Sequence, residues 1–138
     1  MNDQALRAAV GILATAGAAI AGYLTYARFT DTALACATGG CEIVQRSDYA
    51  ELAGIPVALL GLAAYVFLLS TAFSRSELAR AAAAAVAVGG AAFSAYLVYI
   101  QIAVIDAICQ WCVASALLMT ALLAVNAMRM VRYVGAEP

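Results

Sequence analysis

The groups of this sequence that are able to do redox chemistry are four cysteines in two pairs. Cys109 and Cys112 form a C-x-x-C, a spacing that on a helix places both sulfurs on one face, close enough for a disulfide. Cys36 and Cys41 form a second pair in a polar segment. Four cysteines allow three pairings, and sequence proximity favours 36 with 41 and 109 with 112. These pairs indicate thiol–disulfide exchange, in which a thiolate attacks a disulfide sulfur.

Two other uses of the cysteines are compatible with their number. Both pairs could be static structural disulfides, although a helical bundle in lipid does not need them for stability. A single zinc site made of all four thiolates is disfavoured, because 67 residues separate the pairs against about 15–20 in a zinc ribbon. We therefore expect no metal.

Other chemistries are excluded by what the sequence lacks. It contains neither His nor Lys. This removes Ser-His hydrolysis, His-ligated haem, the usual zinc and copper sites, and Schiff-base catalysis. The net charge of −1 provides no basic surplus for holding nucleic acid, so no nucleic-acid partner is expected.

The elements that must position the cysteines are long apolar segments. Hydrophobic residues make up 67% of the 138 residues and charged residues 11%, whereas a soluble domain is about 25% charged. A helix crosses the roughly 30 Å apolar core of a bilayer in about 20 residues. Stretches without charge, near or above that length, predict an all-α, integral-membrane bundle of four transmembrane helices in a single domain, 1–138. The predicted spans are about 7–28, 55–74, 80–105 and 109–130.

A polar loop, 30–53, separates the first two predicted spans and carries Cys36, Cys41 and Ser47. Mixed apolar and charged residues over 42–52 predict a short helix that lies in the membrane interface. Gly54-Ile55-Pro56 is expected to open the second span, because a proline in the first turn of a helix lacks only an N–H that has no helical partner. The glycines and alanines of the third span are expected to let neighbouring helices pack closely.

Arginines indicate the orientation in the membrane. Five of them lie on the side of the termini and of the link between spans two and three, and two lie on the other side. The positive-inside rule then places the termini in the cytoplasm and all four cysteines on the extracytoplasmic side of a multi-pass cell membrane. Asp106 is a candidate N-cap for the last span and a candidate proton acceptor.

The order of these features resembles that of the vitamin K epoxide reductase family, in its bacterial, quinone-linked, disulfide-forming branch. The resemblance covers roughly 23–124. It is carried by both cysteine pairs, by the serine that lies between them and by further motif residues, namely Gly54-Ile55-Pro56, Gly61, Tyr65, Ser94, Tyr96, Leu97, Asp106 and Ser115. It implies a four-helix bundle with a quinone, menaquinone or ubiquinone, near the C-x-x-C.

The resemblance also implies a mechanism. A reduced thioredoxin-fold partner attacks the loop disulfide at Cys36, Cys41 attacks Cys109, and Cys112 passes the electrons to the quinone. Ser47 and Ser115 are candidate hydrogen-bond donors to the quinone, and Trp111 is a candidate cap on its ring. Alternatively, Ser115 bonds within its own helix, and most of the tyrosines near the outer ends of the spans form an ordinary interfacial belt.

Two departures from the family affect the expected substrate and the expected partner. Animal enzymes hold vitamin K with an asparagine and a tyrosine at the positions of Val57 and Ala116, which favours simple quinone reduction here over reduction of vitamin K epoxide. Many bacterial relatives carry a fused thioredoxin-like domain, whereas this chain ends at Pro138, so we expect the partner to be a separate protein. The competing hypotheses are a true vitamin K epoxide or quinone reductase, and a non-enzymatic membrane module with structural disulfides.

Overall fold

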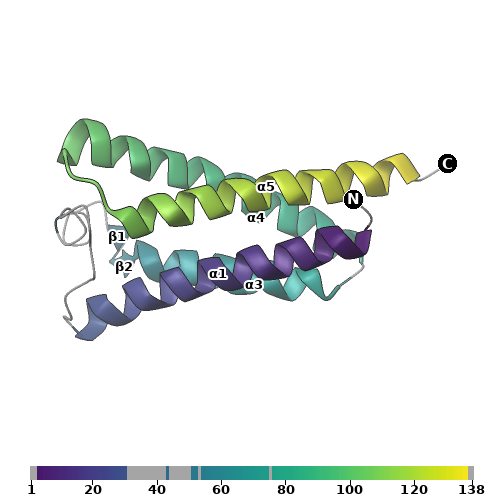
Figure 1. Ribbon diagram of the computed structural model, residues 1–138, viewed down its shortest axis with the longest axis horizontal. Coiled ribbons are helices and arrows are strands. Elements are labelled where there is room, and N and C mark those ends of the chain that lie inside the picture. The colour runs from purple at the N-terminus through teal and green to yellow at the C-terminus, as the bar shows by residue number, and fades with distance from the viewer. Residues whose placement is uncertain (1–2, 31–42, 44–50, 53, 75, 137–138) are drawn as a thin grey trace.

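Four helices form a closed ring in this computed structural model, which describes residues 3–30, 43, 51–52, 54–74 and 76–136. α1 packs against α3 and α5, and α4 packs against α5 and α3. Figure 1 shows the helices lying side by side, with both termini at one end. In chain order the elements are α1 (Asp3–Thr30), β1 (Glu51–Leu52), β2 (Ile55–Pro56), α3 (Val57–Ala72), α4 (Glu77–Ile100), the π-helix η2 (Gln101–Ile105) and α5 (Gln110–Ala136).

Three of these helices are long and apolar enough to cross a membrane. They cover Gln4–Thr30, Glu77–Ile105 and Gln110–Arg132. The predicted helical bundle is therefore confirmed, with three of its four expected spans. The second expected span, 55–74, is shorter: α3 has 16 residues and is about 24 Å long, because Ile55 and Pro56 are in a strand and the helix ends at Ala72.

Small residues of α4 are buried in the bundle, as expected for the third span. Ala83 and Ala87 are fully buried on one face of α4. A Cβ on Gly90 would lie 2.9 Å from Sδ of Met119 on α5, so only glycine fits there without movement of the methionine. Gly89, by contrast, is exposed and has no such neighbour.

The contact between α1 and α3 depends on one glycine and one tyrosine. Tyr65 of α3 is 1% exposed, and its ring occupies the space that a Cβ on Gly17 of α1 would take. At the end of the bundle that holds the termini, Nε of Arg7 donates to the carbonyl oxygen of Ala72 at 2.8 Å. This bond satisfies one of the carbonyls that the last turn of α3 leaves without a helical partner.

Local signals explain where α3 and α4 begin. Pro56 has extended geometry, belongs to β2 and directly precedes the first residue of α3, so it stands one residue before the helical turn in which it was expected. The side chain of Ser76 accepts a hydrogen bond from the N–H of Ala79 at 3.1 Å, a standard N-cap. α4 therefore begins at Glu77, three residues before the predicted start of the span at 80.

A small hairpin precedes α3 at the end of the bundle opposite the termini (Figure 1). Leu52 pairs with Ile55 and Glu51 with Pro56, and Gly54 lies in the turn with a φ of +82°, a conformation that glycine adopts without strain. The last two residues of the expected interfacial helix over 42–52 are thus extended and not helical. Apart from the exposed Ile43, the remainder of that helix lies outside the described residues.

Candidate functional site

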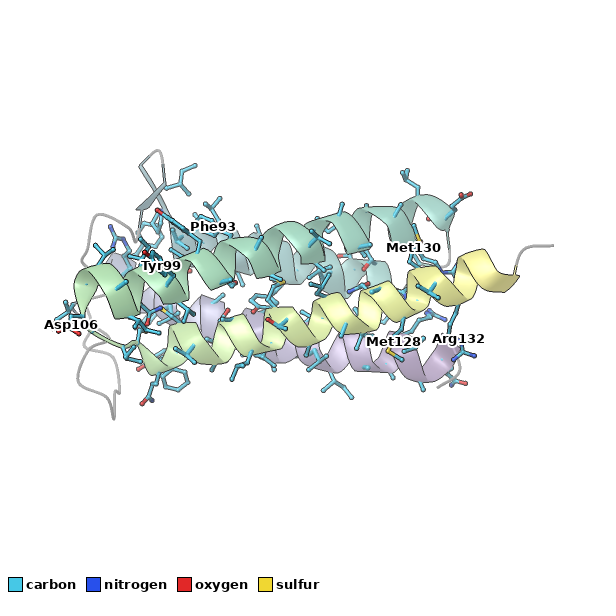
Figure 2. The ribbon with its side chains drawn as sticks, turned by 90° about the horizontal axis from the view of Figure 1, so that it is seen from above. Phe93, Tyr99, Asp106, Met128, Met130 and Arg132 are labelled. Atoms are coloured by element: carbon cyan, nitrogen blue, oxygen red, sulfur yellow. The ribbon has the colours of Figure 1, made fainter. Side chains whose placement is uncertain are left out.

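The link between α4 and α5 leads the chain into the C-x-x-C. α4 continues into the wider π-turn η2, which ends at Ile105 and is capped by Asp106. Asp106 has a φ of 57° and a ψ of 39°, the left-handed conformation, which aspartate tolerates better than most residues. Its N–H bonds to the carbonyl oxygen of Gln101, as does the N–H of Ala107, at 3.1 Å. Figure 2 shows Asp106 at the tip of the bundle, opposite Arg132.

The expectation that Asp106 caps the last helix is therefore wrong. Asp106 closes the preceding π-turn, and α5 begins at Gln110. Cys109 stands directly before α5, and its Sγ accepts the backbone N–H of Cys112 at 3.4 Å. This is the bond that a serine or aspartate oxygen makes at an ordinary N-cap. The sulfur of Cys109 thus lies at the positive end of the α5 dipole, where a thiolate is favoured.

Gln101 holds the backbone of Cys109 from the other side. Its side chain is 1% exposed, and Oε1 accepts the backbone N–H of Cys109 at 2.8 Å. The two residues are eight positions apart, with the whole irregular link between them. Sequence reasoning missed Gln101; the signal that could have found it is an amide side chain inside a charge-free apolar run, where a polar group needs a partner.

The surroundings of the C-x-x-C are apolar. Cys109 is fully buried, and Cys112 is half-buried. Side chains that pack around Cys109 come from both sides of the link and from the first turn of α5: Ile105, Ala107, Trp111 and Cys112. This apolar setting shields the sulfur of Cys109 from water and strengthens the hydrogen bonds made there.

Trp111 joins the first turn of α5 to α1. Its ring lies edge-on against that of Tyr23, with centroids 5.3 Å apart and an interplanar angle of 73°. Both rings are half-buried. Tyr26, Tyr96 and Tyr99 are exposed, as residues of an interfacial belt would be. Trp111 and Tyr23 therefore form an aromatic wall beside the cysteine pair.

Ser115 lies three residues beyond Cys112, and its hydroxyl meets α3. The hydroxyl of Tyr65 donates to the carbonyl oxygen of Ser115 at 2.7 Å, and the two hydroxyl oxygens are also 2.7 Å apart. Because a carbonyl only accepts, the second contact has Ser115 donating to Tyr65. In this arrangement the Ser115 oxygen can still accept a hydrogen bond, but its proton is already donated to Tyr65. Ser115 can donate to a quinone oxygen only if it gives up the bond to Tyr65.

The structure describes only some of the other residues expected in the site. Cys36, Cys41 and Ser47 lie outside the described residues, so the structure does not place them. α1 ends at Thr30 and β1 begins at Glu51 at the end of the bundle where α5 begins (Figure 1). Val57 and Ala116 are both half-buried, and neither side chain offers a hydrogen bond.

One comparison assigns the chain to a group of known proteins. The family model described as "Vitamin K epoxide reductase family" matches residues 8–127. The match takes in most of α1, the hairpin, α3, α4, η2 and the C-x-x-C, together with most of α5. The chain therefore belongs to the vitamin K epoxide reductase family, whose members are membrane oxidoreductases that use quinones.

Proposed function

We propose that this protein oxidises an extracytoplasmic thioredoxin-fold protein and passes the electrons through its two cysteine pairs to a quinone. The observation that carries the proposal is the arrangement at the start of α5. There, the sulfur of Cys109 accepts the N–H of Cys112 at 3.4 Å in an apolar setting beside an aromatic wall. The position at the positive end of the α5 dipole favours a thiolate, and the apolar setting suits a ligand with a flat apolar ring.

The described residues fit a quinone. Trp111 offers an aromatic ring next to Cys112, and Ser115 carries a hydroxyl one turn further along α5. When bound, a quinone accepts the two electrons and two protons that leave a dithiol as it becomes a disulfide. Trp111 would pack against its ring, and Ser115 would donate to a quinone oxygen after its hydroxyl exchanges the bond to Tyr65. The apolar side chains at Val57 and Ala116 favour quinone reduction over reduction of vitamin K epoxide.

The thiol steps need only thiolate attack on disulfide sulfurs. A partner thiolate attacks Cys36, and Cys41 leaves as a thiolate; the second partner thiol then closes the partner's disulfide and releases Cys36. Cys41 attacks Cys109, and Cys112 leaves. Cys36 attacks Cys41, which restores the loop disulfide and leaves Cys109 and Cys112 reduced. Their oxidation by the quinone completes a cycle that moves two electrons and two protons from partner to quinone.

The proposed function also requires an orientation. We place α3 across the membrane as the fourth span. Because α3 is short, the hairpin before it and the residues that follow it would complete the crossing. The arginine bias then puts the termini in the cytoplasm of a cell membrane. The C-x-x-C faces the extracytoplasmic side, where disulfides form.

Turnover of the purified full-length protein tests the proposal. The protein, in detergent, receives a reduced thioredoxin-fold protein together with a soluble menaquinone or ubiquinone analogue, and quinol formation is followed by absorbance. We expect quinone-dependent oxidation of the partner, which Cys36→Ala reduces to the uncatalysed rate. Vitamin K epoxide in place of the quinone is expected to remain unreduced.

Thiol labelling separates this function from a membrane module with static disulfides. When quinone is withheld and reduced partner is present, a relay accumulates free thiols, whereas structural disulfides stay oxidised. Full activity of Cys36→Ala would remove the loop pair from the mechanism. Absence of turnover with any quinone, together with no labelling, would overturn the proposed function.

A further inference from the structure

Gln101 is a buried polar residue that contacts the C-x-x-C, and the proposed relay gives it no role. It is the first residue of η2 and is 1% exposed. Its carbonyl oxygen accepts the N–H groups of Asp106 and Ala107, and its side-chain oxygen accepts the N–H of Cys109. One residue therefore fixes the beginning, the middle and the end of the link that carries the chain into the C-x-x-C.

Two hydrogen bonds in series connect Gln101 to the sulfur chemistry. Oε1 of Gln101 holds the N–H of Cys109 at 2.8 Å, and Sγ of Cys109 accepts the N–H of Cys112 at 3.4 Å. The N–H of Cys109 precedes the first turn of α5, so no carbonyl of that helix is available to it. Without the glutamine oxygen, this N–H would lie unsatisfied in an apolar pocket, and the backbone of Cys109 would be drawn toward another acceptor.

We propose that Gln101 is a positioning residue that raises the reduction potential of the Cys109–Cys112 pair, by fixing Cys109 so that its sulfur accepts the N–H of Cys112. A hydrogen bond to a charged acceptor is stronger than one to a neutral acceptor. The bond to Cys109 therefore stabilises a thiolate more than a disulfide sulfur and favours the reduced pair. A higher potential makes the pair a better acceptor of electrons from Cys36 and Cys41.

This inference rests on the proposed function, in which the pair alternates between disulfide and dithiol. Its test needs neither quinone nor partner. The full-length protein with Cys36→Ala and Cys41→Ala has a single cysteine pair, which is equilibrated in detergent with mixtures of reduced and oxidised dithiothreitol. The Cys109–Cys112 disulfide takes two electrons and two protons from the reagent, which becomes its cyclic disulfide. Alkylation and mass spectrometry then give the reduced fraction.

Gln101→Met keeps the length of the side chain and removes the acceptor. We expect its equilibrium constant for reduction to fall roughly tenfold, which corresponds to about 30 mV toward lower potential. Gln101→Asn keeps the amide but withdraws the oxygen by one methylene, and we expect the same direction of change. This second variant serves as the measurement if the methionine variant does not fold.

Ile102→Met is the matched control, since Ile102 lies in the same π-turn and is 61% exposed. It should leave the equilibrium constant within about twofold of the parent. An unchanged potential in both Gln101 variants would overturn the inference, and so would an equal shift in Ile102→Met. The outcome is separable from the proposed function: a shift without quinone turnover contradicts only the function, and turnover without a shift contradicts only the role of Gln101.

Discussion

The two described links between neighbouring helices solve the same problem in different ways. Between α3 and α4 the chain turns within a few residues, and Ser76 caps the new helix with its own hydroxyl. Between α4 and α5 it passes through a π-turn and a left-handed aspartate, and a cysteine sulfur caps the new helix. The second link also needs the side chain of Gln101, eight residues away from the N–H that it accepts.

This difference separates folding from chemistry. A serine cap is sufficient where the only requirement is to start a helix. A sulfur is a weak hydrogen-bond acceptor as a thiol, so a cysteine in the same place needs further support and gains a reactive thiolate in return. Irregular backbone is concentrated at the end of the bundle where we place the redox chemistry, and the other link is conventional.

The largest expected effect comes from the sulfur at the irregular link. Cys112→Ala should reduce quinone-dependent turnover to background, because the relay then has no thiolate to release next to the quinone. In this variant the Cys109 thiolate should attack Cys41 of the loop disulfide and release Cys36 as a thiolate, and the resulting Cys41–Cys109 disulfide would appear as a mobility shift on a non-reducing gel. Residual turnover near that of the parent protein would show that electrons leave by another route.

Tyr65→Phe tests the bond that ties α3 to the catalytic helix. The ring remains in place against Gly17, but Ser115 loses both contacts with the tyrosine hydroxyl. We expect the free energy of unfolding to fall by about 1–2 kcal/mol, measured by thermal or denaturant unfolding in detergent.

The same variant releases the Ser115 proton for other acceptors. If Ser115 contacts the quinone, KM for the quinone should change in Tyr65→Phe. Tyr65 takes no direct part in the reaction, so this change would act through Ser115. Ser115→Ala is the matched control, since it removes the hydroxyl altogether. Identical KM values in the parent and in both variants would exclude Ser115 from the quinone site.

Ser76→Ala tests the conventional link. It should lower the free energy of unfolding by about 1 kcal/mol, the usual effect of losing an N-cap, and leave quinone turnover unchanged. The measurement is the same unfolding experiment with turnover recorded in parallel. A loss of turnover without a loss of stability would mean that this link also contributes to chemistry and would break the comparison.

Asp106→Gly gives the smallest expected change. Glycine adopts the left-handed conformation of Asp106 without the steric penalty of a Cβ, while it increases the entropy of the unfolded chain. The net change in the free energy of unfolding should be within about 0.5 kcal/mol, and turnover should stay within about twofold. A large loss of turnover would instead show that the carboxylate takes part in proton transfer.

Hydrophobic patterning was enough to predict the helices of the bundle, because a run without charges near 20 residues long is a strong signal for a span. The exact ends depended on single contacts. Ser76 moved the start of α4 to Glu77, and the hairpin before Pro56 shortened α3. Such differences arise because a cap or a strand pair involves one or two residues, too few to alter an average over a segment.

The candidate site was predicted in part. The spacing of Cys109 and Cys112 predicts a pair at the start of a helix, and the structure places Cys109 directly before α5 and Cys112 in its first turn. The bonds from Gln101 to Cys109 and from Tyr65 to Ser115 join residues 8 and 50 positions apart. No local pattern encodes such pairs, because they exist only once the link has folded and α3 lies against α5.

The π-turn also constrains how this stretch of sequence can vary. A π-turn holds one residue more than the α-helical turn that it replaces. Deleting one residue within 102–105 would leave an ordinary α-helical turn in place of the wider turn that the N–H of Asp106 closes onto the carbonyl oxygen of Gln101. The link from Gln101 to Cys109 would then be one residue shorter, and the bond from the glutamine oxygen to the N–H of Cys109 would have to form across a different backbone path. Substitutions within this turn are open to selection one at a time, whereas a change of its length would remove the whole arrangement in one step.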